Sequence, residues 1–556
     1  MRKISRYPAV LLVAALAVCG LGAGGSREGE RFAPVAVERI APLPAGPVHP
    51  AAGVPRAVAV ALPEVDEEDA AAGKARAAIT PTAEPADSEV ALPAGGPRGA
   101  AVRAASAGIS FDGLDRTAAA NNGQLSFPPD TTLAKSGFRL LQGTNSALRL
   151  FTPTGGVLAT RDLNTFFDAA LSDGMLFDPK VLFDGGDPKN RRLYVAALQF
   201  SRRPRVSVLW LAVSRQSNPG DLEPASWCRY RIDAIREPGT AGATWADHTG
   251  LGVGLDALVV TTNQYRFSDN GFTFPIVRAL DKRSLAANAS ACPALTSYLF
   301  QAGTTAGDRN AFSLQPVAHL TRPTSPRGAA NPAYLVSTAR APAKTYRVWR
   351  LSNLAGGSPK LEVVDRQGTF TYDIPPNAPQ PGGGPPLQTG DHRIVQAVAV
   401  GDTLWAAHTT LCTIGGSGGA NASCIRLLSF QAGTGAPFAA SLVQQLTFAG
   451  GPGVFYWMPG IAVTLSGQTA VAFQGSSPAA FLGAYWTLKA PAAPSFPAAQ
   501  ALGAGACAQT IADRTGDYLG VLTNPNDLAS FWLAGERTGV VEGSCVWQTR
   551  IAQVAP

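Results

Sequence analysis

Short apolar runs, each followed by a turn rich in Gly, Pro, Asn or Asp, dominate the chain from about residue 131 to its end. A compact example is the run 518–523, which is followed by the turn 524–527 and by the aromatic pair Phe531 and Trp532. Residues of these types favour tight reversals, so the pattern predicts two β-strands joined by a turn. The most complete unit, residues 175–232, contains four strand candidates separated by turns. Because four antiparallel strands form one blade of a β-propeller, this unit predicts that fold.

Weaker versions of the unit recur along the chain, and repetition at this scale is typical of propellers and arrays. We count six units and predict an all-β, six-bladed β-propeller of four-stranded antiparallel blades. Strand-like runs in residues 138–161 would complete the sixth blade and so remove an exposed sheet edge. If these residues form a blade of their own, the propeller is seven-bladed.

Residues 1–25 have the three parts of a signal peptide. Basic residues precede the apolar stretch 9–22, which is short for a bilayer span, and small residues follow it. We therefore expect an exported protein, located outside the cell, in a periplasm or at the cell surface. A second interpretation is that residues 16–19 form a lipobox, which would place a lipid anchor on Cys19. No other apolar run is long enough to suggest a transmembrane helix.

Residues 26–130 are rich in Ala, Pro and Gly and contain few aromatic side chains. Such a composition cannot bury enough apolar surface to offset the entropy of ordering, so we predict a disordered tether. The β-propeller domain is expected to span residues 131–556.

The composition, 46% hydrophobic and 15% charged, suits a domain with a large core. The net charge is +7, but three of the positive charges lie in the predicted signal peptide and the rest are scattered. The densest basic run, residues 202–205, is typical of a solvated turn. We therefore expect no nucleic-acid partner.

Six cysteines follow Cys19, and an even number in an exported chain indicates disulfides. Their order alone does not decide the pairing, but closeness in the sequence favours neighbours. No Cys-x-x-Cys pair occurs and no His lies at ligand spacing from a Cys, so we expect no zinc site. The expected pairs are Cys228 with Cys292, Cys412 with Cys424, and Cys507 with Cys545.

Several short motifs resemble a group of secreted bacterial proteins, mostly without assigned activity, that look like sialidase-type β-propellers. The resemblance covers roughly residues 137–554 and implies the fold more than a function. The motifs are Phe-Asp-Pro-Lys-Val-Leu-Phe at 177–183, Thr-Thr-Asn-Gln-Tyr at 261–265, Ala-Leu-Asp-Lys at 279–282, Leu-Trp-Ala-Ala-His at 404–408 and Gly-Asp-Tyr-Leu-Gly at 516–520.

Residues 268–274 look like the Asp-box of sialidases. The Asp, Gly and Thr of that motif match, whereas Phe267 and Phe274 replace its usual Ser and Trp. The resemblance implies a structural turn between two blade strands. We expect Asp269 to cap backbone N–H groups and Gly271 to adopt a positive φ.

The resemblance to sialidases would imply a Tyr nucleophile, an assisting Glu and three arginines that hold a carboxylate. No arginine here lies in a recognisable sialidase context, and no Arg-Ile-Pro motif is present. Neither a Gly-x-Ser-x-Gly elbow nor a phosphate-binding Gly-rich loop occurs. We therefore assign no catalytic residue and lean against an enzyme.

Polar residues near the start of each predicted inner strand are the candidate ligand-binding set, because such positions ring one mouth of a propeller channel. Converging Asp and His side chains could bind a cation or transfer protons. The alternative is that they cap backbone amides at buried strand ends. The set is Asp178, Asp247, His248, His319, His392, Trp457 and Asp517, with Gln315 and Asp391 beside two of the histidines.

Within this set, we expect Asp517 to face the channel while Tyr518 packs between blades, and we expect His408 to be a packed residue. The favoured hypothesis is an exported binding or adhesion module that recognises a glycan, a peptide or a surface partner at the channel mouth. A sialidase-type glycoside hydrolase and a cell-envelope scaffold without a small ligand are the alternatives. We expect no cofactor, with Ca²⁺ as the one ion that the aspartates could hold.

Overall fold

The computed structural model describes residues 28–44, 59–61, 106–120, 125–186, 191–303, 311–320, 331–415, 419–510 and 513–556. Within these ranges the chain is almost entirely β-strand. The predicted signal peptide and Cys19 lie outside the described residues. No described helix is long and apolar enough to cross a membrane. The α-helices are α2 (Arg116–Ala120), α3 (Leu163–Phe167) and α4 (Lys282–Ala287).

Three sheets each contain four strands that follow one another in the chain and pair antiparallel. We call such a set of four consecutive strands a run; its first strand lies at one edge of the sheet and its fourth strand at the other. The first sheet holds β6 (Thr132–Lys135), β7 (Leu140–Gly143), β8 (Ala147–Phe151) and β9 (Val157–Asp162). The second holds β10 (Leu176–Asp184), β11 (Arg192–Ser201), β12 (Val206–Ser214) and β13 (Trp227–Asp233). The third holds β26 (Phe455–Val463), β27 (Thr469–Ser477), β28 (Ala480–Lys489) and β29 (Gln500–Gly503).

A 14-stranded sheet contains three more runs of the same kind. The runs are joined because β18 pairs in parallel with both β14 and β22, the first strands of the neighbouring runs. The first run is β14 (Thr244–Val253), β15 (Ala257–Arg266), β16 (Phe272–Asp281) and β17 (Leu295–Gln301). The second is β18 (Gln315–His319), β19 (Ala333–Thr338), β20 (Ala343–Ser352) and β21 (Lys360–Tyr372). The third is β22 (Ile394–Val400), β23 (Thr403–Ile414), β24 (Ala420–Ala432) and β25 (Ala440–Phe448).

Where these first strands pair, glycine permits the close approach. A Cβ on Gly252 of β14 would lie 2.6 Å from Cβ of Pro316 in β18. Such a contact is too short for any larger residue, so Gly252 is required for this junction.

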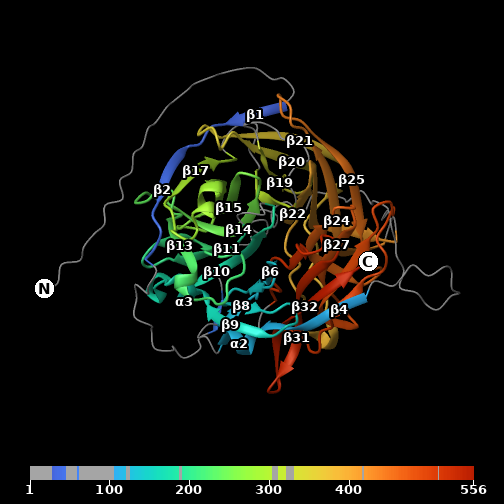
Figure 1. Ribbon diagram of the computed structural model, residues 1–556. Coiled ribbons are helices and arrows are strands. Elements are labelled where there is room, and N and C mark those ends of the chain that lie inside the picture. Colours follow the sequence, from blue (N-terminus) through green and yellow to red (C-terminus); the bar gives the residue numbers. More distant parts are fainter. Residues whose placement is uncertain are drawn as a thin grey trace.

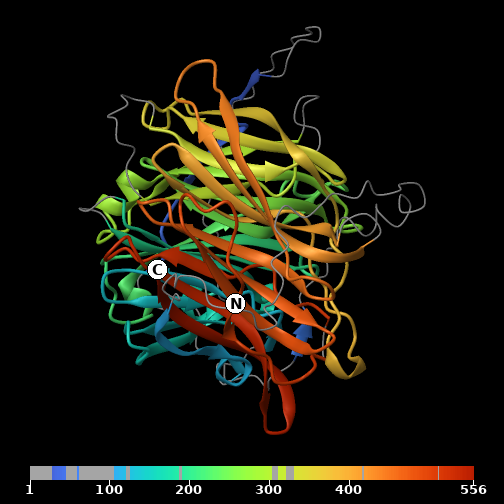
Figure 2. The same ribbon diagram turned by 90° about the vertical axis from the view of Figure 1, so that its right-hand side faces the viewer.

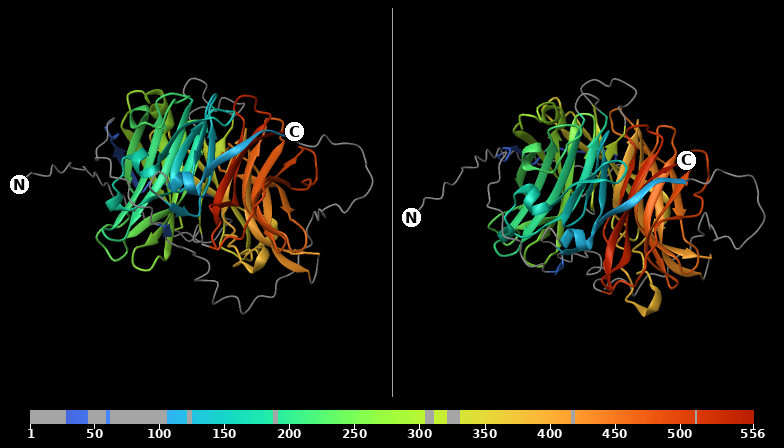
Figure 3. Two further views of the ribbon diagram at one scale, coloured as in Figure 1. Left: turned by 90° about the horizontal axis from the view of Figure 1, so that it is seen from below. Right: turned by 60° about the horizontal axis from the view of Figure 1, so that its bottom comes forward.

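The last sheet is completed by a strand from the N-terminal side of the chain. Its order is β30 (Gly520–Thr523), β31 (Phe531–Val541), β32 (Ser544–Ala555) and β4 (Ser106–Asp115), and all its pairs are antiparallel. Figure 3 shows β4 lying beside the red strands at the end of the chain. The expectation that residues 138–161 complete this sheet is wrong, because β7 pairs with β6, β8 with β7 and β9 with β8, so these residues form a separate sheet, as the alternative had it.

The first strands of successive runs contact one another in a closed order that returns from β30 to β6. In Figure 1 the runs follow the chain around a common axis, from cyan through green, yellow and orange to red. The side view in Figure 2 shows the strands of neighbouring runs lying alongside one another. The chain is therefore an all-β assembly of four-stranded antiparallel sheets with the arrangement of a β-propeller, as predicted.

Five described strands lie within the segment that we predicted to be a disordered tether: besides β4, β3 (Ala59–Ala61) and β5 (Leu125–Phe127) pair in parallel with each other. The other two are β1 (Glu28–Phe32), which pairs with β21, and β2 (Ala36–Ile40), which pairs with β17. Each covers the outer edge of a run that would otherwise expose unpaired backbone groups. Low hydrophobicity did not prevent these residues from pairing, because an edge strand needs backbone hydrogen bonds more than side-chain burial.

The core lies between neighbouring sheets, and β11 shows why its strands are continuously apolar. Leu193, Val195 and Ala197 pack in a cluster with the β6–β9 run. The alternate residues Tyr194 and Ala196 pack in another cluster with the β14–β17 run. Successive side chains of a strand point to opposite faces, so a strand between two sheets must be apolar at every position.

Three disulfides form, and they are the three predicted pairs. Cys228–Cys292 joins β13 to the segment after α4 and so links two neighbouring runs. Cys412–Cys424 lies within the β23–β24 hairpin, and Cys507–Cys545 ties the approach to β30 to β32. Three disulfides indicate a chain that folds in an oxidising compartment, which fits an exported protein.

The Asp-box-like residues form the turn between β15 and β16. The Asp269 carboxylate accepts a hydrogen bond from the Gly271 N–H at 2.8 Å and pairs with Arg266. The expected cap is therefore confirmed. The expected positive φ of Gly271 is wrong, because Asn270 takes it, with φ of 58°. Gly271 leaves room for Arg266 instead, since a Cβ would lie 1.9 Å from a guanidinium nitrogen.

Candidate functional site

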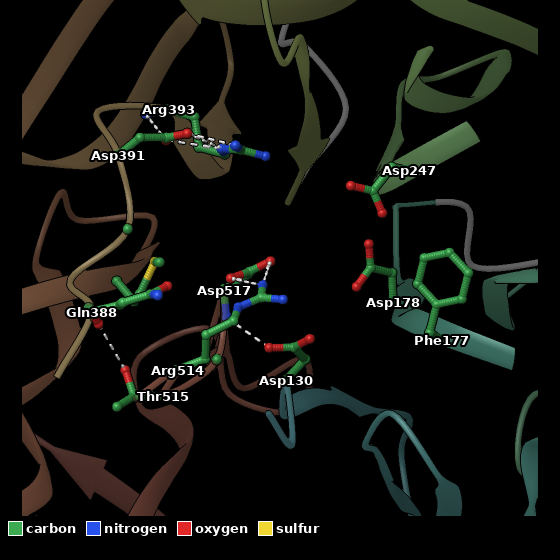
Figure 4. A pocket seen from close by; sticks show the side chains of 13 residues that line it. Asp130, Phe177, Asp178, Asp247, Gln388, Asp391, Arg393, Arg514, Thr515 and Asp517 are labelled. Atoms are coloured by element: carbon green, nitrogen blue, oxygen red, sulfur yellow. Dashed lines mark hydrogen bonds and ion pairs between the residues drawn. The ribbon is translucent and has the colours of Figure 1, made fainter. Parts of the chain in front are cut away.

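A polar cavity, partly open to solvent, lies where the first strands of the runs begin. Aspartate side chains from several runs face this space in Figure 4. Two arginines accompany them, each beside one aspartate. The charged residues that line the cavity are Asp130, Asp178, Asp247, Asp391, Arg393, Arg514 and Asp517.

An unusual backbone conformation presents these side chains. Asp130, Asp178, His248, Met458 and Gly516 have positive φ values of 47°, 50°, 54°, 48° and 92°. Four of them are not glycine, and positive φ is uncommon for such residues. In β10, β14 and β26 the register of the strand also shifts at this point. Such a bulge re-aims side chains, so the same irregularity in several runs turns polar groups toward the axis.

Some of the carboxylates also join neighbouring runs. Asp178 Oδ2 accepts a hydrogen bond from the His248 N–H at 2.9 Å, and Asn145 Oδ1 accepts one from the Asp178 N–H at 2.7 Å. Asp130 Oδ1 accepts the Asp517 N–H at 2.6 Å, which links the first sheet to the last. Asp130 and Asp178 therefore cap backbone groups, as the structural alternative required, while still lining the cavity.

Two of the aspartates are held as carboxylates by arginine. Asp391 accepts hydrogen bonds from Arg393 Nε at 2.9 and 2.8 Å, and Arg514 donates to both oxygens of Asp517 at 2.9 and 3.0 Å. Burial opposes ionisation of both acids, but the arginines outweigh it and lower the pKa of Asp391 and of Asp517. These pairs are balanced in charge and supply fixed hydrogen-bond acceptors.

The other three aspartates behave differently. Burial and the charge of Asp247 raise the pKa of Asp178 to about 8, and burial and the charge of Asp517 raise the pKa of Asp247 to about 6. Burial and the charges of Asp517 and Asp178 raise the pKa of Asp130 well above its usual range. Near neutral pH the cavity therefore contains protonated carboxyl groups, which donate hydrogen bonds, beside carboxylates, which only accept them.

A lysine and a tyrosine lie behind the carboxyl groups. The Lys180 ammonium lies 3.0 Å from the centre of the Tyr518 ring, and the Tyr518 hydroxyl donates to the Pro179 carbonyl at 2.8 Å. Burial lowers the pKa of Lys180 to about 7 against the opposing charge of Asp178. Tyr518 packs between runs, as expected, and Asp517 faces the cavity.

Oxygens of Asp130, Asp178 and Asp517 lie within 4.8 Å of one another, which is a spacing that a cation could bridge. Both oxygens of Asp130 already accept hydrogen bonds, from Asn145 and from the Asp517 backbone. A cation would therefore have to share these oxygens with existing donors, and the set fits Ca²⁺ only with that competition.

The structure brings together Asp178, Asp247 and Asp517 of the predicted set, together with Asp391. His248 is buried next to Asp178 but does not line the cavity. Burial and the charge of Arg393 lower the pKa of His248 well below its usual range.

Two other predicted residues support the wall instead of lining it. The His392 imidazole is fully buried and bonds to the Thr338 hydroxyl at 3.1 Å and to the Ala341 N–H at 3.0 Å. The Trp457 indole donates to the Thr515 hydroxyl at 2.8 Å. Trp457 thereby fixes Thr515, which does line the cavity.

His319 does not belong to this mouth. It is the last residue of β18, and it lines a different cavity near the other ends of the first strands. We had placed it at the same mouth as Gln315, which lies four residues earlier. Because a strand rises about 3.3 Å per residue, Gln315 and His319 lie at opposite ends of β18. His408, expected to be packed, is fully buried against the Tyr346 hydroxyl.

Sequence reasoning missed Asp130, Lys180, Arg393 and Arg514. Asp130 lies one residue before the expected start of the folded domain, so the tether prediction concealed it. The arginines each follow or precede a candidate aspartate by two or three residues, at 391–393 and 514–517. An arginine within three residues of a candidate aspartate is the signal that could have indicated them.

Comparisons with known proteins do not identify the chain. No protein-family model matches it, and no curated protein matches it. An α-L-arabinofuranosidase from Fusarium graminearum superimposes with a TM-score of 0.33 and 10% identity over 76% of this chain and 93% of that one. A sialidase from Trypanosoma rangeli superimposes with a TM-score of 0.31 and 9% identity over 73% of this chain and 56% of that one. The WD40 domain of SCAP from fission yeast superimposes with a TM-score of 0.29 and 8% identity over 76% of this chain and 84% of that one. Superpositions this loose carry no argument about the site.

Proposed function

We propose that the chain is an exported binding protein that recognises a glycan at the polar cavity, outside the cell or in a periplasm. The observation that supports this most is the mixture of protonated carboxyl groups and arginine-held carboxylates around one space. A sugar hydroxyl both donates and accepts hydrogen bonds, so a wall offering both kinds of partner suits it. We also propose that the seven runs of four strands are seven blades of one propeller, because their first strands form a closed ring.

The disposition of charge argues against some other ligands. Asp391 and Asp517 are each neutralised by an arginine, and the raised pKa values keep Asp130 and Asp178 protonated near neutral pH, which leaves Asp247 as the remaining carboxylate. A strongly anionic ligand would meet the charge of Asp247 and would find no arginine without a carboxylate partner among the charged residues that line the cavity. A neutral or cationic sugar fits better than an acidic one.

The test is thermal melting of the full chain with a panel of neutral, amino and acidic glycans. We expect one neutral or amino class to raise the melting temperature, because a ligand that binds only the folded state stabilises it. Asp247→Asn should abolish that shift, because it replaces a carboxyl group of the cavity wall by an amide of similar size. Asp269→Asn, the same change in an exposed turn outside the cavity, should keep it.

A shift that survives in Asp247→Asn would contradict the proposed site. No shift with any glycan would contradict the proposed ligand and would favour a protein partner or a scaffold role. A shift that needs Ca²⁺ and disappears with a chelator would indicate that the aspartates bind the ion first.

A second candidate, glycoside hydrolysis, is favoured by one observation. Oxygens of Asp178 and Asp517 lie within 4.8 Å of each other, while the pKa of Asp178 is raised to about 8 and that of Asp517 is lowered. Glycosidases use such a pair, one carboxyl protonated as the acid and the other ionised. Release of reducing sugar from the stabilising glycan, lost in Asp178→Asn, would establish this activity; a stable complex without product would exclude it.

A further inference from the structure

A second cavity, partly open to solvent, lies farther along the same first strands. It shares no lining residue with the polar cavity. In β10 the polar cavity is lined by Asp178 and the second cavity by residues 181–183; in β14 these are Asp247 and Val253. The strands thus begin at one cavity and end at the other.

The wall of this second cavity is mostly apolar. Each first strand, from β6 to β30, contributes at least one residue to it. Most of the contributed side chains are aliphatic, so an apolar ligand displaces water there favourably. The aliphatic residues that carry this argument are Leu133, Val181, Val398, Val463, Val521 and Leu522.

Carboxyl groups dominate the polar cavity, whereas the charged residues of the second cavity are both basic. Lys135 and Arg191 line it, and none of the described residues in its wall is an aspartate or a glutamate. Behind the wall, Asp184 and Lys282 form a buried pair at 2.6 Å and balance each other. His319 adds ring surface but no polar contact, because both its ring nitrogens are buried. The wall therefore favours an anion over a cation.

The two basic side chains differ in availability, and Lys135 is the less available one. Its ammonium already donates to the Ser136 and Gly137 carbonyls at 3.0 and 3.2 Å. Burial lowers the pKa of Lys135 to about 8 against the opposing charge of Asp527, so the amine is mostly protonated at pH 7. Lys135 thus adds positive charge to the wall, while its hydrogen bonds are largely committed.

Arg191 is the available group. It lies one residue before β11 and is exposed to solvent, and none of the described residues pairs with its guanidinium. A guanidinium presents paired N–H donors that match both oxygens of a carboxylate. Arg191 can therefore hold a carboxylate at the rim of the cavity without giving up an existing contact.

The position of Arg191 fixes how such a ligand lies. Taking an ionised group deep into an apolar wall is costly, so the charged head stays at the exposed rim and the apolar part enters the cavity. Residues 181–183 of β10 span two rises of about 3.3 Å along the wall, so an alkyl chain of medium length fits better than a short acid.

We propose that the second cavity binds an aliphatic carboxylate, with the alkyl chain against the aliphatic wall and the carboxylate on Arg191. The site is separate from glycan recognition at the polar cavity, because the two walls have no residue in common. Its test therefore does not depend on the proposed function.

The test is calorimetric titration of the full chain at pH 7 with octanoate, octanol and octylamine, which share one alkyl chain. Each is used below the concentration at which it forms micelles. We expect saturable binding of octanoate, tighter than that of octanol by about 3- to 10-fold, which is the size expected of a charge pair at a partly exposed site. Octylamine should bind more weakly than octanol, because its ammonium meets two basic side chains.

Arg191→Gln removes the charge and keeps a polar side chain. It should lose the preference for octanoate, while its affinity for octanol stays that of the parent chain. Arg203→Gln, the same change in an exposed turn outside the cavity, is the matched control and should keep the preference.

A second variant tests the cavity itself. Ala318 lines the wall, so Ala318→Trp should fill the space and abolish binding of octanoate and octanol. Val540→Trp, at an exposed position of β31 outside the cavity, is its control and should bind normally. Thermal melting shows whether each variant folds; if Ala318→Trp does not, Val398→Phe replaces it, since Val398 also lines the wall.

Three results would overturn the proposal. The first is no saturable binding of octanoate to the parent chain. The second is binding of octanol or octylamine as tight as that of octanoate, which would show that the wall does not select an anion. The third is an unchanged preference for octanoate in Arg191→Gln, or unchanged binding in the folded cavity-filling variant, which would place the ligand elsewhere.

Discussion

At the scale of single residues, Asp178 serves both structure and site. One of its oxygens accepts the His248 N–H from the next run, and the residue lines the polar cavity. Its positive φ of 50° places it there at a conformational cost. A buried carboxyl that only capped an amide would not need to face four other carboxyl groups. The acidic groups around Asp178 are the feature on which the proposed ligand site depends.

Asp178→Asn should change how stability depends on pH. The pKa of Asp178 rises from 3.8 in the ordinary state to about 8 in the folded chain. Between these values the folded state holds a proton that the unfolded state has lost, so stability falls as pH rises. Asn cannot lose a proton and keeps an oxygen for the His248 N–H.

The melting temperature of Asp178→Asn minus that of the parent should therefore be near zero at pH 4 and positive, roughly 1–3 °C, at pH 8. Asp269→Asn is the control, because hydrogen bonds from Arg266 and from the Gly271 N–H hold the pKa of Asp269 below its usual value, so its difference should not grow between pH 4 and pH 8. An equal difference at pH 4 and pH 8 for Asp178→Asn would show that this carboxyl titrates normally.

At the scale of elements, β4 decides how the ring closes. It pairs with β32 and gives the last sheet its fourth strand. Leu114 in β4 is fully buried, its N–H donates to Gln142 of β7 at 2.7 Å, and its carbonyl accepts from Thr549 of β32 at 2.5 Å. One strand thus ties the first run to the last.

Leu114→Ala should lower the free energy of unfolding by about 2–4 kcal/mol, because it removes a buried side chain from a packed site. Val540→Ala, at a residue that is 56% exposed, should cost less than about 0.5 kcal/mol. Urea unfolding of the two variants and the parent measures both values. Equal, small losses would mean that residues 106–115 behave as the tether that composition suggested.

At the scale of the whole molecule, the two ends of the channel differ in chemistry. Polar groups gather where the first strands begin, and aliphatic groups gather farther along them. The disulfides act on the same scale, because Cys228–Cys292 closes a loop of 64 residues between two runs while Cys412–Cys424 closes 12 within one hairpin. A cross-link stabilises by restricting the unfolded chain, and more so for longer loops.

Replacing both cysteines of the 228–292 pair with serine should therefore cost more stability than the same change in the 412–424 pair. Loop entropy gives about 4 kcal/mol for the longer loop and about 3 kcal/mol for the shorter one. Guanidinium unfolding of the two double variants measures the difference. A larger loss for the hairpin pair would show that strain or local packing outweighs loop entropy.

The sequence by itself determined the local features of this protein. Runs such as 193–198 are apolar at every position, as strands buried on both faces must be, and closeness along the chain favoured the three disulfide pairs that form. The aspartates at 178, 247 and 517 could be selected because each lies near the start of a strand. These properties depend on neighbours within a few residues.

Only the tertiary structure decided the rest, because it depends on pairing between distant segments. β4 meets β32 across more than 400 residues, and Asp130 meets the Asp517 backbone across 387, so no local pattern could reveal either contact. The length of β18 moved His319 away from the mouth where we had placed it. The pKa values of the aspartates likewise arise from charges that ring closure brings together, and no single run contains them all.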